Sequence, residues 1–178
     1  MLGDGPGHLS EIGQRVLAGL LATMRDFCLL FAPNINSYKR YQPGSFAPTA
    51  LRWGVDNRTC ALRIAGHGEG MRVENRVPGG DVNPYLAIAA LVAGALHGIE
   101  NELSLEDEFV GNAYHDETAG RVPGTLREAA ELWSGSAVAQ EAFGADVVGH
   151  YANMGRVELA AYDAAVTDWE LRRGFERL

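Results

Sequence analysis

The chain has 178 residues, of which 47% are hydrophobic and 21% are charged, as expected of one soluble globular domain. Its net charge of −8 and pI near 5.1 argue against nucleic acid or an anionic membrane as a partner. The two cysteines, Cys28 and Cys60, form no CxxC motif, which fits the reducing cytoplasm and excludes a disulfide framework or a thiolate zinc site.

The first part of the chain predicts one long helix followed by a loop. Residues 1–8 are rich in Gly and Pro and predict a disordered segment or a truncated loop. Apolar residues then recur at helical spacing from Leu9 to Met24, with Ser10 as the N-cap. After a short apolar turn at 27–31, the prolines of residues 34–48 predict an extended loop.

Three strands are predicted next, at 50–55, 60–64 and 71–77, and we expect them to form a small antiparallel sheet. Because side chains alternate along a strand, Arg72, Glu74 and Arg76 share one face of the third strand. That pattern is typical of a solvated edge or of a floor that binds an anion or a metal.

Helices dominate the remainder. Asn83 caps a helix over 85–97 that is apolar nearly all round, so we expect burial on most faces and an end at Gly98. Residues 102–124 predict a loop. Further helices are predicted at 125–134, where a capping box begins the helix, at 136–143, and from a cap at Asp146 into the last residues. The predicted fold is therefore α+β, one domain over residues 1–178 with a small antiparallel sheet packed with helices; its motifs lie in 9–101 and its C-terminal helices in 125–178.

The segment 34–76 is basic within an acidic chain. Seven cations and three anions give it a net charge of +4, so the rest of the chain sums to −12. The cations are Lys39, Arg40, Arg52, Arg58, Arg63, Arg72 and Arg76. Guanidinium groups match carboxylate and phosphate geometry, so a small anionic ligand is one interpretation. Ordinary surface arginines on a solvated strand region are the alternative.

Three ordered motifs make the functional interpretation more specific. They read NINSYKRYQPGSFAP at 34–48, NRTCALRI at 57–64, and ENRVPGGDVNPYLAIAALVAGALHGIEN at 74–101. Together they resemble the C-terminal half of the glutamine synthetase catalytic domain, and most of all the branch that joins glutamate to amines other than ammonia. The resemblance implies an ATP-dependent ligase that forms a γ-glutamyl amide through γ-glutamyl phosphate. It also implies homo-oligomers or assembly with full-length family members.

The resemblance implies roles for particular residues. Arg40 and Arg76 would bind the substrate glutamate, while Arg58 and Arg63 would bind ATP phosphates, with Arg58 also catalytic. Glu74 would be a ligand of Mg²⁺ or Mn²⁺. These roles suit phosphoryl transfer, in which positioning and cationic groups supply most of the catalysis, and hard cations, which prefer carboxylate oxygens.

Two departures from the family pattern qualify this expectation. Phe46 stands where ammonia-using members carry a glutamate. Phenylalanine can neither bind ammonium nor take up its proton, so either the amine site admits a larger amine, which the retained arginines favour, or amine chemistry is lost. The family's N-terminal β-domain and most of its metal-binding carboxylates have no counterpart in this sequence, so catalysis is expected to need a second part. The alternatives are a non-catalytic remnant that binds a nucleotide or an acidic metabolite, or that assembles with relatives, and a helical interaction module.

Overall fold

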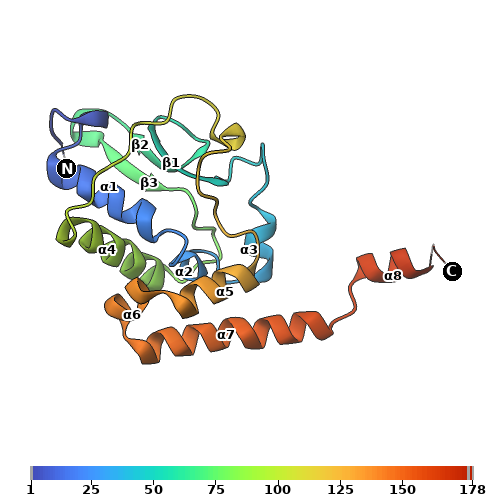
Figure 1. The fold of residues 1–178 in the computed structure, drawn as a ribbon. Coiled ribbons are helices and arrows are strands. Elements are labelled where there is room, and N and C mark those ends of the chain that lie inside the picture. Colours follow the sequence, from blue (N-terminus) through green and yellow to red (C-terminus); the bar gives the residue numbers. More distant parts are fainter. Residues whose placement is uncertain (1, 176, 178) are drawn as a thin grey trace.

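The computed structural model describes residues 2–175 and 177, which form a small three-stranded sheet at one end and a group of helices on one side of it (Figure 1). The α+β prediction is confirmed. In order, the helices are α1 (Glu11–Thr23), α2 (Cys28–Phe31), α3 (Ile35–Lys39), α4 (Pro84–Glu100), α5 (Leu126–Gly135), α6 (Ala137–Phe143), α7 (Ala145–Ala164) and α8 (Asp168–Phe175). The strands are β1 (Ala50–Val55), β2 (Cys60–Ala65) and β3 (Arg72–Asn75). Short 3₁₀ turns lie at Pro6–His8, Gly68–Gly70 and Ala113–His115.

The sheet has the order β1-β2-β3 and is mixed rather than antiparallel. The β2–β3 pair is antiparallel as predicted, whereas β1 and β2 run parallel. The connection at residues 56–59 folds the chain back along the strand. Asp56 takes a positive φ of 50°, and the Asn57 amide donates to the carbonyls of Phe109 and Gly111 at 3.2 and 2.9 Å. Contacts with a distant segment therefore hold a connection that looks like a hairpin turn in the sequence.

Helices α1 and α4 pack closely beside the sheet. Ser10 caps α1 as predicted, with its hydroxyl accepting from the Gly13 amide at 3.2 Å. Gly98 does not end α4, which continues to Glu100. A Cβ placed on Gly98 would lie 2.0 Å from the carbonyl oxygen of Arg15, so this glycine permits a close helix crossing.

One face of α4 is open, contrary to the expectation of burial on most faces. Tyr85, Ile88, Val92 and Leu96 are exposed, from 84% at Tyr85 to 48% at Leu96. The expected burial is met only on the faces that contact neighbouring helices.

Two predicted loops contain regular structure. Residues 34–48 include α3, because Asn34 and Ser37 form a reciprocal capping box at its first turn. In the N-terminal segment, Leu2 and Leu9 form a β-bridge around the 3₁₀ turn.

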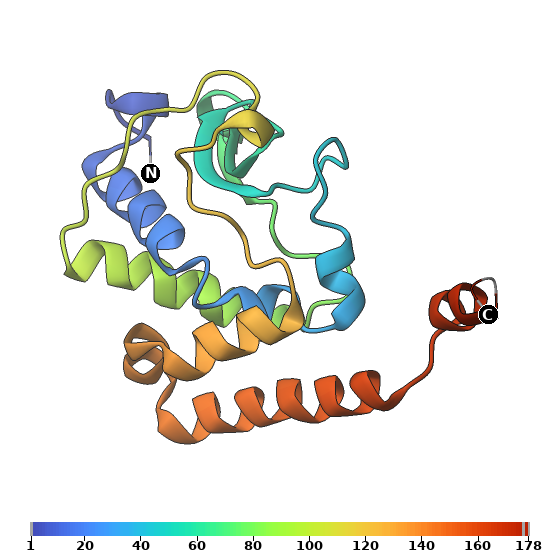
Figure 2. The same cartoon turned by 45° about the vertical axis from the view of Figure 1, so that its right-hand side comes forward.

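The long C-terminal helix predicted from Asp146 is two helices. α7 begins after Gly144, at which no side-chain cap hydrogen bond forms, and it ends at Ala164. α8 follows after a short break and extends away from the body (Figure 2). The break occurs where Ala165 leaves the helical conformation with φ −86° and ψ 132°.

The core joins the early motifs to the C-terminal helices. Trp133 on α5 is fully buried, packs edge-on against Phe27 at 6.2 Å, and donates to the Val148 carbonyl at 2.9 Å. Within the described residues, no helix combines the length and the hydropathy needed to cross a membrane.

Candidate functional site

The centre of the candidate site is the ion pair between Arg63 on β2 and Glu74 on β3. These residues face each other across the antiparallel pair, and Arg63 Nη1 donates to both Glu74 carboxylate oxygens at 3.0 and 3.1 Å. Arg63 Nη2 also donates to Asp56 Oδ1 at 2.7 Å. The hydrogen bond from Arg63 lowers the pKa of Glu74 in spite of partial burial, so Glu74 is held as a carboxylate.

Arg76 continues the cluster just beyond β3. Its Nη1 lies 3.5 Å from Glu74 Oε2, its Nη2 donates to the Phe46 carbonyl at 2.8 Å, and its Nε donates to the Arg58 carbonyl at 3.2 Å. Only 15% of the Arg76 side chain is exposed. One guanidinium therefore fixes the 43–48 loop and the 56–59 connection against the sheet.

Arg40 reaches the same region from the C-terminal end of α3. Its guanidinium lies 4.9 Å from the Tyr41 ring and donates to the Val77 carbonyl. That carbonyl also accepts from the Tyr41 hydroxyl at 2.9 Å. The carbonyl that receives both donors belongs to the residue directly after Arg76, so Arg40 is linked to the cluster through the backbone.

Arg58 differs from the other predicted arginines because its side chain is exposed. Among residues 2–175 and 177, no acidic side chain forms an ion pair with it. Its guanidinium is therefore available to an incoming anion, and its backbone carbonyl joins it to the cluster by accepting from Arg76.

The balance of charge favours an anionic ligand. Arg63, Arg72 and Arg76 supply three positive charges to the ion-paired cluster, and Asp56 and Glu74 supply two negative ones, which leaves +1. The same residues offer few oxygen ligands to a divalent metal. In the part of the chain that the structure describes, no group of three His, Cys, Asp or Glu side chains could hold a metal ion. These residues alone do not fit a magnesium or manganese site, which needs several oxygen ligands.

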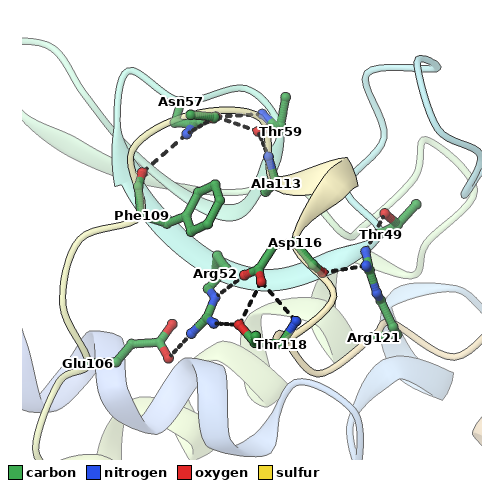
Figure 3. Close-up of polar contacts among 11 residues, drawn as sticks. Thr49, Arg52, Asn57, Thr59, Glu106, Phe109, Ala113, Asp116, Thr118 and Arg121 are labelled. Carbon is green, nitrogen blue, oxygen red and sulfur yellow. Dashed lines mark hydrogen bonds and ion pairs between the residues drawn. The ribbon is translucent and has the colours of Figure 1, made fainter.

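Arg52, counted with the basic segment, has a separate structural role (Figure 3). Its Nε donates to Asp116 at 2.7 Å, its Nη1 to Glu106 at 2.6 Å and its Nη2 to the Thr118 hydroxyl at 2.9 Å. These bonds attach the 102–124 segment to β1. The sequence gives one local signal of this network, since Asp116 and Thr118 have the spacing of an Asx turn.

The cavity between α4 and α6 lies apart from this cluster. Its volume is about 530 Å³, and its lining includes Val92, Leu96, Val138 and Phe143 but none of the five predicted site residues. Those residues are Arg40, Arg58, Arg63, Glu74 and Arg76.

Comparison with known proteins identifies relatives over nearly the whole chain. The family pattern "Glutamine synthetase, catalytic domain" matches residues 2–174. The gamma-glutamylethanolamide synthetase GlnA4 of Streptomyces coelicolor is 64% identical over 97% of this chain, and the glutamate–isopropylamine ligase of a Pseudomonas species is 44% identical over 96%. The gamma-glutamylputrescine synthetase PuuA of Escherichia coli is 48% identical over 66%.

Solved structures agree in fold. A chain described as a GmaS/ADP complex superposes with a TM-score of 0.88 and 32% identity over 98% of this chain. The chain spans 37% and 38% of the length of the first two relatives and 42% of that solved chain. Each match therefore covers well under half of the longer protein.

Proposed function

The chain belongs to the glutamine synthetase family, and from this premise we propose that it forms part of an ATP-dependent ligase joining glutamate to an amine. The observation that carries the proposal is the cluster in which Glu74 pairs with Arg63 and Arg76, while the backbone carbonyl of the exposed Arg58 accepts from Arg76. In this proposal the cluster recognises the acidic substrate and the nucleotide phosphates.

The proposed reaction has two steps. An oxygen of the glutamate γ-carboxylate attacks the γ-phosphorus of ATP, and ADP leaves. The amine nitrogen then attacks the γ-carbonyl carbon, phosphate leaves, and the nitrogen loses a proton. Both steps develop negative charge on phosphate oxygens, which positioned cations stabilise.

The residues of this chain divide into two groups in the proposal. Arg40 and Arg76 bind glutamate. Arg63 binds ATP phosphate, and Arg58 moves from solvent onto the phosphate that is transferred. The free guanidinium of Arg58 suits this role because no ion pair in the described residues has to break first.

The family expectation of Mg²⁺ or Mn²⁺ requires more ligands than the described residues bring together. Glu74 would supply one carboxylate, and its lowered pKa keeps it ionised. The remaining oxygen ligands would come from groups outside this cluster, such as the nucleotide phosphates and water.

Phe46 supports an amine larger than ammonia. It lies at the tip of the 43–48 loop with φ 61° and is 69% exposed, while its carbonyl accepts from Arg76. A bulky residue at positive φ persists when the surroundings impose it, which is a common feature of ligand sites. An exposed aromatic side chain on the loop whose backbone contacts Arg76 favours an amine with an apolar part.

The test is reconstitution of a complete ligase. This chain is co-expressed with the portion of the Streptomyces coelicolor relative that it lacks, and γ-glutamyl amide formation from glutamate, ATP and ethanolamine or isopropylamine is measured. Arg76→Ala is expected to lower kcat/KM by about 30-fold or more, equivalent to about 2 kcal/mol. Arg127→Ala, an exposed arginine on α5 paired with Asp163, is the matched control and should have wild-type activity. Turnover that survives Arg76→Ala contradicts the proposal.

A non-catalytic role is the second candidate, and it rests on the same arginines together with a lone metal-ligand candidate, Glu74, which is already paired with Arg63. In that case the chain binds a nucleotide through Arg58 and Arg63 or assembles with full-length relatives. Isothermal titration of the chain with ATP and Mg²⁺ separates the two candidates: binding without turnover in the reconstituted pair supports this one.

We also propose that the protein acts in the cytoplasm within a homo-oligomer or an assembly with full-length relatives. The two buried free cysteines, Cys28 and Cys60, suit a reducing compartment.

A further inference from the structure

Two side-chain donors hold the backbone of the 43–48 loop. Arg76 Nη2 donates to the Phe46 carbonyl at 2.8 Å, and the Tyr114 hydroxyl donates to the next carbonyl, that of Ala47, at 2.9 Å. Ala47 is buried, so its carbonyl would be costly to leave without a donor. The exposed Phe46 ring therefore stands on backbone that is held at two consecutive carbonyls, and Tyr114 supplies one of the two bonds.

Tyr114 is itself held in place by its neighbours. It lies on the 3₁₀ turn at Ala113–His115, which the Asn112 side chain caps by accepting from the Tyr114 amide at 3.1 Å. The Ala113 amide donates to the Thr59 hydroxyl at 2.9 Å, as Figure 3 shows, and Ala113 is fully buried. The backbone that carries the Tyr114 ring is therefore fixed before the hydroxyl reaches the loop.

The turn that carries Tyr114 joins the two segments that hold Phe46 and Arg58. Thr59 directly follows Arg58 in the 56–59 connection, and it binds the turn whose tyrosine reaches the 43–48 loop. Arg76 makes a second bridge, because it donates to the carbonyls of both Phe46 and Arg58. A loop attached at one point could still swing about that point, whereas attachment at two points fixes its direction.

We propose that Tyr114 is a positioning residue that holds the 43–48 loop, and with it the Phe46 ring, in place beside the 56–59 connection. What the inference says of the amine rests on the proposed function, in which Phe46 favours an amine with an apolar part. Tyr114 acts through Phe46 and not on the reacting atoms. Loss of its hydroxyl frees the loop and weakens the preference for such an amine, while the phosphate-binding arginines keep their positions.

The first measurement is amide hydrogen exchange of this chain by NMR, which needs no activity. Tyr114→Phe removes only the hydroxyl. The amides of Ser45 and Ala47 donate to the Gln42 carbonyl at 3.1 Å and to the Ser45 hydroxyl at 3.2 Å. Both amides are expected to exchange about five-fold faster in the variant, because the loss of one hydrogen bond lowers the free energy of local opening.

The second measurement uses the reconstituted ligase and compares isopropylamine with ammonium. The ratio of kcat/KM for isopropylamine to that for ammonium is expected to fall about five-fold in Tyr114→Phe, mainly through a higher KM for isopropylamine, because an apolar contact is lost. KM for ATP should stay within about two-fold of wild type, since Arg58 and Arg63 are unchanged. General damage to the fold would not separate the two amines in this way.

Tyr162→Phe is the matched control. Tyr162 lies on α7 and is 40% exposed, and its hydroxyl forms no hydrogen bond among the described residues. This variant should keep the wild-type exchange rates and the wild-type amine ratio. If Tyr114→Phe shows no cooperative thermal unfolding, Asn112→Ala replaces it, because this change removes the cap on the Tyr114 amide and leaves the loop's own side chains intact.

Unchanged exchange at Ser45 and Ala47 in Tyr114→Phe would overturn the inference, and so would an equal change in Tyr162→Phe. Faster exchange with an unchanged amine ratio would overturn the role in amine selection. If the wild-type pair makes no γ-glutamyl amide, the proposed ligase and the amine preference are both rejected. The exchange rates then still decide whether Tyr114 holds the loop.

Discussion

At the scale of single residues, the arginines of one basic segment have different environments. Arg52 is matched by Asp116 and Glu106, whereas Arg63 and Arg76 share Glu74. The partners of Arg52 lie 54 and 64 residues further along the chain. Its structural role is therefore hidden in the sequence. Strand periodicity predicts only that Arg72, Glu74 and Arg76 share a face, whereas the position of Arg63 opposite Glu74 depends on the register of β2 and β3.

Asp116 is expected to make stability depend on pH. Hydrogen bonds from Thr118 and then Arg52 lower its pKa in the folded state. A lowered folded pKa contributes stability above the unfolded value of about 3.9, and this contribution is lost as the pH falls through the folded pKa. Asp116→Asn should therefore lower Tm at pH 7. The difference in Tm between the variant and the wild type should become smaller below about pH 4. Differential scanning calorimetry from neutral to acidic pH measures this difference.

The neighbouring Glu117→Gln is the control for that measurement. Glu117 is exposed, and in the described residues its carboxylate makes no hydrogen bond or ion pair, so its Tm profile should follow the wild type. If the difference in Tm between Asp116→Asn and the wild type were the same at every pH, the variant would have lost packing contacts rather than charged hydrogen bonds.

At the scale of whole helices, the crossing of α1 and α4 depends on glycine. A Cβ at Gly98 would meet the Arg15 carbonyl at 2.0 Å and Gly19 backbone atoms at 2.7 Å. Gly98→Ala gains about 1 kcal/mol of helix propensity, but overpacking against backbone costs about 1–3 kcal/mol or more. We expect net destabilisation of about 2 kcal/mol in urea unfolding.

Gly149→Ala on α7 isolates the propensity effect. Nothing lies within 4 Å of a Cβ built there, so the substitution should stabilise the protein by about 0.5–1 kcal/mol. If Gly98→Ala stabilised the protein as much as Gly149→Ala does, the α1–α4 crossing would accept the extra methyl group without a loss of unfolding free energy, which contradicts the prediction.

Local signals predicted these elements better than distant contacts did. Ser10, Asn83 and Thr125 were identified as caps because a cap depends on residues two or three positions away. The parallel pairing of β1 depends on bonds from Asn57 to Phe109 and Gly111, which no local pattern reveals. The sequence predicts a helix end at Gly98, whereas the role of Gly98 as a contact depends on α1, a helix far from it in sequence.

At the scale of the whole molecule, the C-terminal helices contribute unequally to the hydrophobic core. Trp133 and Val148 connect α5 and α7 to the N-terminal helices, and Ala152 is buried beside them. α8, by contrast, buries none of its residues and lies at the end of an extended arm (Figure 2). The candidate site and the open face of α4 both belong to the body and not to this arm.

This distribution predicts how truncation affects folding. Hydrophobic burial supplies most of the favourable free energy of folding, so removal of residues 166–178, whose described part buries nothing, should leave Tm within about 2 °C of the full chain. Truncation after Gly144 should instead lower Tm severely, because it removes Val148, Ala152 and the acceptor of the Trp133 hydrogen bond. Thermal unfolding of both chains distinguishes them. A large decrease in Tm on removal of residues 166–178 alone would contradict this prediction and show that the arm stabilises the body.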